Sequence, residues 1–362
     1  MTVRWGIIGC GNVTEVKSGP AFQKAEGSAL VAVSRRTPGL AEDYARRHGV
    51  PRWYTDEAAL IADPEVDAVY IATPPGEHER LAHLVCAAKK PAYVEKPMAR
   101  NHAECLRMNQ AFAAARVPLF VAYYRRGLAR FRKARELVAS GALGVVTGVS
   151  VRFTGPYHRA VGAGDAGATS GALPRATTMP GVTLPWRLQA EQSGGGLFLD
   201  LGCHTLDVLD FVLGPLEDVD GSAANVATPH AVEDAVALRF RTEAGALGVA
   251  QWNFAASERV DAIVVSGTQA ELRLSTFGNE PVELWRGGDA PAERFDLPNP
   301  PHIQQPLVQS IVDELHGRGR CDSTGVSAAR TQAIMDTALV GYYGSRGDGF
   351  WKNPSRWPGR RH

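Results

Sequence analysis

The first 125 or so residues alternate short apolar, β-rich runs with segments of helical length. Residues 77–90 and 102–115 carry apolar side chains at helical spacing, with Gly, Pro or Lys near their ends. Five apolar runs lie before, between and after such segments, at residues 3–9, 29–35, 67–73, 92–97 and 119–124. This order predicts a doubly wound parallel sheet with helices on both faces, an α/β arrangement.

After about residue 145 the pattern changes to longer runs in which apolar and polar residues alternate, at 145–153, 233–242, 245–254, 259–267 and 270–276. Turn-forming segments such as TEAG and SGTQ join them, which indicates a large, open, mainly antiparallel sheet. Helices are expected at 197–213, 304–316 and 327–343. A chain of 362 residues exceeds the size at which one core stops growing. We therefore expect two domains, residues 1–125 and an α+β domain over 126–362.

The stretch from 159 to 185 is rich in Gly, Ala, Thr and Pro and has little periodicity, so it reads as a long loop. A lid over a substrate and a plain surface excursion both fit that composition. A second unusual stretch, residues 125–135, is dense in arginine. It is predicted to be a solvated helix face, with an anion site as the alternative.

Charge and cysteine content narrow the class of protein. The formal net charge is only +1, without the basic excess that binding to a nucleic-acid backbone usually requires. No apolar run is long enough to cross a bilayer, and no signal peptide is recognisable, so a cytoplasmic protein is expected. The five cysteines are scattered and never form a CxxC pair, which predicts reduced thiols and no zinc site.

A candidate nucleotide site follows the first strand, in the segment GIIGCGNVTEV. Gly9 permits a tight turn and Gly11 lets the backbone approach a pyrophosphate, but Thr14 replaces the third glycine of the usual fingerprint. The second strand ends in Ser34, Arg35 and Arg36, where an NAD-preferring site would carry an acid. Because a guanidinium suits a 2′-phosphate, NADP(H) is favoured, with NAD(H) possible and solvated arginines as the alternative.

Other strand ends carry groups that fit the same site. Thr73 and Pro74 lie at the end of the run at 67–73, and Lys96 lies near the end of the run at 92–97. Ligands bind at the carboxyl ends of strands in open α/β sheets, although a proline there is also a plain turn. A lysine beside a cationic nicotinamide would be pushed toward deprotonation and could exchange a proton, whereas a lone strand-end lysine is more often solvated.

Asp200 and His204 are four residues apart in a predicted helix, so their side chains share one face. A carboxylate beside an imidazole orients it and allows it to relay a proton. The alternatives are a helix-capping aspartate and a buried core histidine. The neighbouring Cys203 and Asp207 do not complete a metal site, because adjacent residues face different ways on a helix and no second cluster appears.

Taken together, the GCGNV turn, Ala72-Thr73-Pro74-Pro75 followed by His78, Glu95-Lys96-Pro97, Trp186-Arg187 and GGGLFLDLGCHTLD resemble the Gfo/Idh/MocA family. The resemblance covers nearly the whole chain and implies a Rossmann domain followed by an open antiparallel α/β domain. It implies a catalytic lysine and histidine at Lys96 and His204, with Asp200 beside the substrate. The cofactor-binding residues it implies, together with those read from the strand ends, are Gly9, Gly11, Asn12, Val13, Ser34, Arg35, Arg36, Thr73, Pro74, His78, Glu95, Lys96, Trp186 and Arg187.

The same resemblance implies an enzyme that passes a hydride between a nicotinamide cofactor and a sugar, sugar derivative or polyol. It also implies a homodimer or homotetramer assembled through the open sheet. The alternatives within the fold are an NAD-dependent glycoside hydrolase, a trans-dihydrodiol-type dehydrogenase and a non-enzymatic nucleotide-sensing regulator. The last is disfavoured because Lys96, Asp200 and His204 are all present.

Overall fold

The computed structural model describes residues 2–156, 184–347 and 349–360. Two compact units make up the chain, Met1–Leu128 with Pro300–Ala329 and Ala129–Asn299 with Arg330–His362. The sequence-based division placed everything after residue 125 in the second domain, whereas residues 300–329 pack with the first unit. The loop predicted at 159–185 lies, except for its last two residues, outside the described residues.

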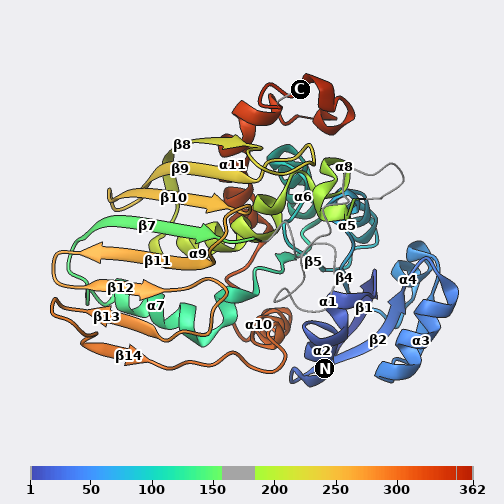
Figure 1. The fold of residues 1–362 in the computed structure, drawn as a ribbon. Coiled ribbons are helices and arrows are strands. Elements are labelled where there is room, and N and C mark those ends of the chain that lie inside the picture. Colours follow the sequence, from blue (N-terminus) through green and yellow to red (C-terminus); the bar gives the residue numbers. More distant parts are fainter. Residues whose placement is uncertain (1, 157–183, 348, 361–362) are drawn as a thin grey trace. The chain divides into compact units, whose positions relative to one another are not determined.

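The first unit is built on a parallel sheet of six strands in the order β3-β2-β1-β4-β5-β6, of which Figure 1 labels β2, β1, β4 and β5. The strands are β1 (Val3–Ile8), β2 (Ser28–Ser34), β3 (Arg52–Tyr54), β4 (Ala68–Ile71), β5 (Ala92–Val94) and β6 (Leu119–Val121). Every residue of β4 and β5 is buried, as expected for strands covered on both faces. The predicted doubly wound sheet is confirmed; the short strand β3 was not predicted.

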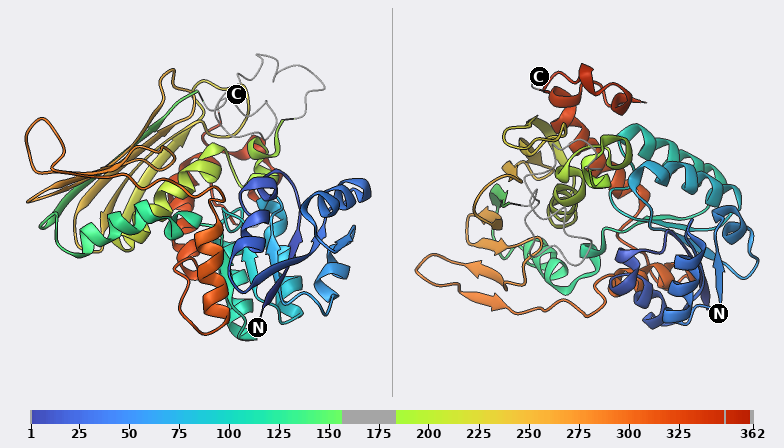
Figure 2. Two further views of the ribbon diagram at one scale, coloured as in Figure 1. Left: turned by 90° about the horizontal axis from the view of Figure 1, so that it is seen from below. Right: turned by 45° about the vertical axis from the view of Figure 1, so that its right-hand side comes forward.

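Helices pack on both faces of this sheet (Figure 2). They are α1 (Asn12–Val16), α2 (Gly19–Lys24), α3 (Pro38–His48), α4 (Glu57–Ala62), α5 (His78–Ala87), α6 (His102–Ala115) and α10 (Gln305–Leu315), with 3₁₀ turns η1 (Pro75–Glu77) and η2 (Tyr124–Gly127). Local signals set their ends: Asp56 and Asn101 accept hydrogen bonds from backbone amides as N-caps of α4 and α6. Gly49, at φ +64°, ends α3.

The segment 300–329 joins this unit because α10 buries an apolar stripe formed by Leu307, Val308, Ile311 and Val312. The helix packs against α2 and η2. Its N-cap, Gln304, accepts a hydrogen bond from Tyr93 on β5 at 2.8 Å. Further along, Thr324 forms a bridge with Phe120 at the edge strand β6. Residues 300–329 therefore belong to the first unit through their packing, although they follow the second unit's sheet in the sequence.

The second unit contains a sheet of eight strands in the order β14-β13-β12-β11-β7-β10-β9-β8 (Figure 1). They are β7 (Val146–Thr154), β8 (Leu216–Ala224), β9 (Ala235–Thr242), β10 (Leu247–Asn253), β11 (Val260–Gly267), β12 (Glu271–Leu274), β13 (Val282–Trp285) and β14 (Glu293–Phe295). Only β10 and β7 pair in parallel; all other neighbours are antiparallel. The predicted sheet is therefore confirmed, with β8, β13 and β14 added.

The remaining helices are α7 (Ala129–Ala139), α8 (Ala190–Ser193), α9 (Cys203–Leu213) and α11 (Gly325–Tyr343), with 3₁₀ turns η5 (Trp186–Leu188), η7 (Phe350–Lys352) and η8 (Pro354–Arg356) and a π-helical turn η6 (Phe198–Gly202). Helices α7 and α9 contact strands β13 and β8. Buried and exposed residues alternate along β9 and β10, so one face of the sheet is covered and the other is open.

The arginine-rich stretch fits its prediction as a solvated helix face only in part, since Arg132 and Arg135 on α7 are exposed. Arg125, Arg126 and Arg130 are all buried. Arg126 donates to the carbonyl of Asp322 at 3.2 Å within the first unit. In the second unit Arg130 donates to Ser275 Oγ at 3.1 Å and to the carbonyl of Glu280 at 3.0 Å. The guanidiniums of Arg126 and Arg130 are tolerated in the interior because their donors reach carbonyl and hydroxyl groups.

Membrane-spanning helices and the state of the cysteines can be judged from the described residues. No helix among them is long and apolar enough to cross a membrane. All five cysteines are buried thiols.

Candidate functional site

The turn after β1 is shaped by Gly9. Its φ of +87° lies in the left-handed region, and its amide and that of Cys10 donate to the carbonyl of Ser34 at 2.9 and 3.1 Å. A Cβ at Gly9 would also lie 3.0 Å from Thr73 Cγ2 and 3.1 Å from the backbone of Ala72. Gly9 is therefore required both by the backbone conformation and by the close approach of β4.

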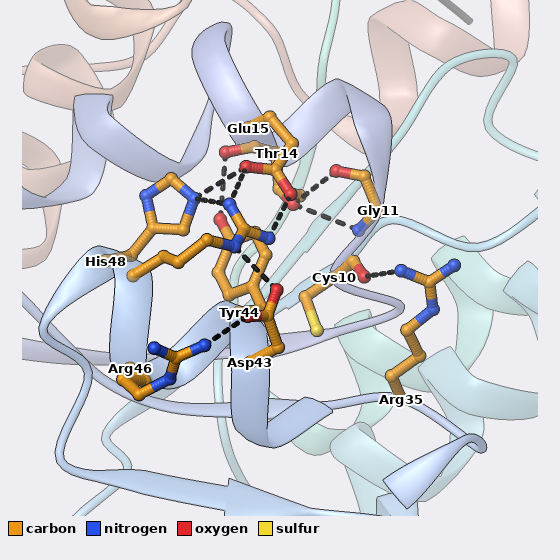
Figure 3. A network of polar contacts seen from close by, with 10 residues as sticks. Cys10, Gly11, Thr14, Glu15, Arg35, Asp43, Tyr44, Arg46 and His48 are labelled. Atoms are coloured by element: carbon orange, nitrogen blue, oxygen red, sulfur yellow. Dashed lines mark hydrogen bonds and ion pairs between the residues drawn. The ribbon is translucent and has the colours of Figure 1, made fainter. Parts of the chain in front are cut away.

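Thr14 takes the place of the third glycine without disturbing the turn (Figure 3). Its hydroxyl accepts from the amide of Gly11 at 3.1 Å and donates to the Gly11 carbonyl at 2.7 Å, which caps α1. Tyr44 of α3 donates to the carbonyl of Thr14 at 2.8 Å. A Cβ at Gly19 would overlap both that carbonyl and the Tyr44 hydroxyl. The glycine that permits close packing is thus five residues later than the usual fingerprint places it.

An ion-pair network fixes α1 against α3 beside this turn (Figure 3). Arg47 donates to both carboxylate oxygens of Glu15 at 2.8 Å, and His48 Nε2 lies 2.7 Å from the same carboxylate. Arg47 also pairs with Asp43 at 2.6 Å. The hydrogen bonds from Arg47 lower the pKa of Glu15 to about 2. Helix α1, which follows the dinucleotide turn, is therefore held against α3 through the contacts of Glu15 with Arg47 and His48.

The end of β2 is electropositive. Ser34 is buried, while Arg35 and Arg36 are exposed. Arg35 Nη1 donates to the carbonyl of Cys10 at 3.3 Å, which places one guanidinium against the dinucleotide turn (Figure 3). Burial raises the pKa of the Cys10 thiol to about 11, which disfavours the reactive thiolate.

The residues at this edge of the sheet fit a nicotinamide dinucleotide. A Cβ at Gly11 would meet only the Gly9 carbonyl, at 3.8 Å, so the backbone there is open to a ligand. Asn12 and Val13 begin α1 directly after it. Among the residues described, none hydrogen-bonds to the buried hydroxyl of Thr73, at the carboxyl end of β4. A phosphate or hydroxyl of the cofactor would satisfy such a group.

His78 lies inside the protein, with no exposed surface. Its Nε2 is 2.8 Å from the carbonyl of Thr73, and its Nδ1 is 3.1 and 3.2 Å from the carbonyls of Pro97 and Met98. Burial lowers the pKa of this imidazole, and the carbonyl contacts oppose the shift. Both nitrogens face backbone oxygens, so His78 connects the loops after β4 and β5, and its contact with the cofactor stays a prediction.

Glu95 is buried at the end of β5, and its carboxylate accepts three hydrogen bonds. The Tyr70 hydroxyl and Gln304 Nε2, the latter at 2.8 Å, donate to Oε1. The backbone amide of Lys96 donates to Oε2 at 3.1 Å. The carboxylate therefore orients the start of the Lys96 loop, while Lys96 itself is half-buried. The sequence carried no signal for Gln304, which lies 209 positions away.

The second unit contributes Asp200 and His204, and the helix predicted there begins with a π-helical turn. Asp200 lies inside that turn and His204 is the second residue of α9, with an imidazole that is nearly fully buried. Single π turns inside helices are frequent at functional sites. Arg187 Nε donates to Asp200 Oδ2 at 3.1 Å, and its guanidinium stacks on Trp186 at 4.4 Å. The predicted Trp186 and Arg187 thus lie beside Asp200.

An aromatic cluster that the sequence did not predict adjoins His204. The Phe277 ring meets the imidazole edge-on, with centroids 5.7 Å apart, and Phe153 lies 5.2 Å from Phe277. Asp261 holds the Phe277 loop by accepting from its amide at 2.7 Å. Thr205, next to His204, hydrogen-bonds to Thr276 at 3.1 Å. The imidazole is therefore bordered by a rigid apolar wall.

The predicted residues fall into two sets. Gly9, Gly11, Ser34, Arg35, Thr73 and Glu95 lie at or beside the carboxyl ends of β1, β2, β4 and β5 within the first unit. Trp186, Arg187, Asp200 and His204 gather within the second. Because the sets belong to different units, the convergence of Lys96 and His204 on one substrate stays a prediction.

Two family models match this chain. Residues 3–123 match the oxidoreductase family with an NAD-binding Rossmann fold, and residues 131–273 match the GFO/IDH/MocA C-terminal domain. Among solved structures, the WlbA dehydrogenase from Bordetella pertussis, in complex with NADH and UDP-GlcNAcA, superimposes with a TM-score of 0.76 at 22% identity, covering 93% of this chain and 94% of that one. That likeness shows the shared fold.

Curated relatives align over nearly their whole length. Oxidoreductase P35 of Formosa agariphila is 34% identical over 92% of this chain and 97% of its own. Trans-1,2-dihydrobenzene-1,2-diol dehydrogenase of Danio rerio is 26% identical, covering 94% of both chains. The 1,5-anhydro-D-fructose reductase of Ensifer adhaerens is also 26% identical, over 93% and 97%. The chain therefore belongs to the Gfo/Idh/MocA family of oxidoreductases, which bind their nicotinamide cofactor in a Rossmann domain.

Proposed function

We propose that this oxidoreductase prefers NADP(H) and transfers a hydride to or from a CH–OH group of a sugar, sugar derivative or polyol. The cofactor preference rests on Arg35 and Arg36, two exposed guanidiniums at the end of β2, one of which lies against the dinucleotide turn. Planar guanidinium donors engage phosphate oxygens in pairs, which an NAD ribose hydroxyl does not require.

In the proposed reaction the cofactor, when bound, supplies or accepts the hydride. The turn at Gly9 and Gly11 admits the pyrophosphate, and Glu95 orients the Lys96 loop through the Lys96 amide. Lys96 Nζ and the imidazole of His204 exchange the proton of the substrate hydroxyl, and Asp200 orients the substrate beside the imidazole.

The substrate class is supported by the wall beside His204. The apolar C–H face of a sugar or cyclitol ring packs on aromatic side chains, while its hydroxyls need polar partners such as Asp200 and Arg187. The Ensifer adhaerens relative is named as a reductase of an anhydrosugar. A cyclic diol is the second candidate, because the ring of Phe277 suits an unsaturated carbocycle and the Danio rerio relative is named for one.

The test is turnover of a panel of sugars, sugar acids, inositols and cyclic diols, followed by the absorbance of reduced nicotinamide. Lys96→Ala and His204→Ala should each lower kcat by about 10² to 10⁴-fold, because each removes a proton-transfer group, with little change in NADP(H) affinity. The exposed Lys24 and His83 provide matched controls, Lys24→Ala and His83→Ala. Full activity in both site variants would refute the assignment. Product release without net nicotinamide reduction would indicate the glycoside hydrolase instead.

We also propose a cytoplasmic homo-oligomer assembled through the open sheet face. Leu247 and Val249 on β10 expose 64% and 60% of their surface there. Apolar side chains gathered on one open sheet face are typical of a surface that a second copy covers.

A further inference from the structure

The glycine run Gly194–Gly196 lies directly before the turn that carries Asp200. Gly194 ends α8 at φ +86°, in the left-handed region. A Cβ at Gly196 would overlap the backbone oxygen of Glu233 and lie 2.9 Å from its carboxyl carbon. The missing side chain at Gly196 therefore allows the backbone to reach the carboxylate of Glu233.

Glu233 is 1% exposed, and its carboxylate is fully engaged. Both oxygens accept from the amide of Gly196, at 2.9 and 2.8 Å, and Oε2 also accepts from the Tyr343 hydroxyl. Burial raises the pKa of Glu233, and burial together with the nearby carboxylate raises that of Tyr343 far above its usual range. A buried carboxylate is tolerated when donors of this kind surround it, and it then holds those donors firmly.

Arg346, beyond the end of α11, holds the other end of the run. Its side chain is 2% exposed, and Nη2 donates to the carbonyl of Gly194. Nη1 pairs with Asp336 at 2.6 Å, and the guanidinium stacks over Phe350 at 4.7 Å. A segment near the C-terminus thus contacts the run that precedes the candidate site.

The anchoring reaches the site through the backbone. The carbonyl of Gly196 accepts from the amide of Leu199 at 3.2 Å, so the residue that donates to Glu233 is also hydrogen-bonded to the first residues of η6. The N-cap of η6 is Leu197, and within the described chain no side chain caps this turn. The orientation of the segment from Asp200 to His204 therefore depends on what holds Gly196.

We propose that Glu233, supported by Tyr343 and Arg346, is a positioning residue that fixes the glycine run and thereby the orientation of the His204 imidazole. The proposal rests on the proposed function for the role of His204 in proton exchange. Activity would then also require Tyr343 and Arg346, which lie near the C-terminus. Glu233 itself is not proposed to contact the substrate.

Two adjacent tyrosines allow a matched test in the full-length protein. Tyr343→Phe removes the hydrogen bond to Glu233, whereas Tyr342→Phe removes a partly buried hydrogen bond to the carbonyl of Ala231, at 2.6 Å. Both variants lose one hydrogen-bonded hydroxyl, so both melting temperatures should fall, and that of Tyr343→Phe should fall further because its partner is a buried carboxylate. Only Tyr343→Phe should lower kcat, by about 10 to 100-fold, because small misplacements of catalytic groups cost this much. NADP(H) affinity should stay equal in the two.

A second readout does not require activity. With ¹⁵N-labelled histidine, assigned through His204→Gln, the His204 resonances should shift in Tyr343→Phe and stay unchanged in Tyr342→Phe. Arg346→Lys, which keeps the charge, should also lower kcat. This variant replaces Tyr343→Phe in the test if Tyr343→Phe does not fold. Equal kcat and unchanged His204 resonances in both tyrosine variants would overturn the proposal. A wild type without turnover but with the selective shift would refute the proposed function alone.

Discussion

Replacing Arg35 with serine provides the sharpest test of cofactor preference. The guanidinium is exposed and lies against the dinucleotide turn through its contact with the Cys10 carbonyl. A unit charge about 4 Å from a phosphate contributes about 1 kcal/mol in water and about 4 kcal/mol at a less hydrated protein surface. Because Arg35 is well solvated, we take about 1 to 2 kcal/mol, which is roughly 5 to 30-fold in the Kd of NADP(H).

The assay is titration of both cofactors by quenching of intrinsic fluorescence at fixed ionic strength. NADP(H) binding should weaken by the stated factor and become less salt-dependent, while NAD(H) binding should change by less than about 2-fold, since it lacks the phosphate. Arg46→Ser is the matched control, because that side chain is 76% exposed and pairs only locally with Asp43. Equal weakening of both cofactors in Arg35→Ser, or a wild type that already prefers NAD(H), would refute the phosphate-binding role.

Three further outcomes are expected. Because pairing lowers the pKa of Glu15 from 4.5 to about 2, its stabilisation is present above the unfolded pKa and is lost as the pH falls through that interval. Glu15→Gln should therefore cost about 1 to 2 kcal/mol at neutral pH, after allowance for solvent screening, and only a few tenths of a kcal/mol at about pH 2, where the carboxylate of the folded protein is about half protonated, measured by urea unfolding; an equal cost at both would contradict this. Gly196→Ala should destabilise by about 1 to 3 kcal/mol through overlap with Glu233, whereas Gly341→Ala, in open space on α11, should be neutral or stabilising in thermal melts. Val249→Glu on the open sheet face should reduce the particle mass in light scattering, and an unchanged oligomer would exclude that face.

Periodicity predicted most of the fold because the apolar pattern is strong there. The expected helix 102–115 coincides with α6, whose N-cap Asn101 is a local signal. The strands that were not predicted are of two kinds. β3, β13 and β14 are short and mix charged with apolar residues, unlike the equally short but wholly apolar β5 and β6, and β8 contains Gly221 and a mixed polar sequence. Their pairing depends on neighbouring strands, which no local pattern encodes.

The candidate site shows a similar division. Gly9, Arg35 and Thr73 were predictable because strand ends of a parallel sheet meet at one edge. Gln304 and Phe277 were not, because each reaches its partner, Glu95 or His204, from a distant part of the sequence. His78 was predicted as a cofactor ligand from its place in a motif. Only the structure shows that its ring nitrogens lie next to backbone carbonyls, because the spacing of residues in a sequence does not indicate the contacts of a side chain.

We propose that Lys96 and His204 act on the same substrate proton, and the rate of single-turnover hydride transfer in three variants reports whether they do. Residues that work as one unit show strongly non-additive losses. Lys96→Ala combined with His204→Ala should therefore be about as slow as the slower single variant. Multiplication of the two losses, or a near wild-type rate in either single variant, would contradict the claim.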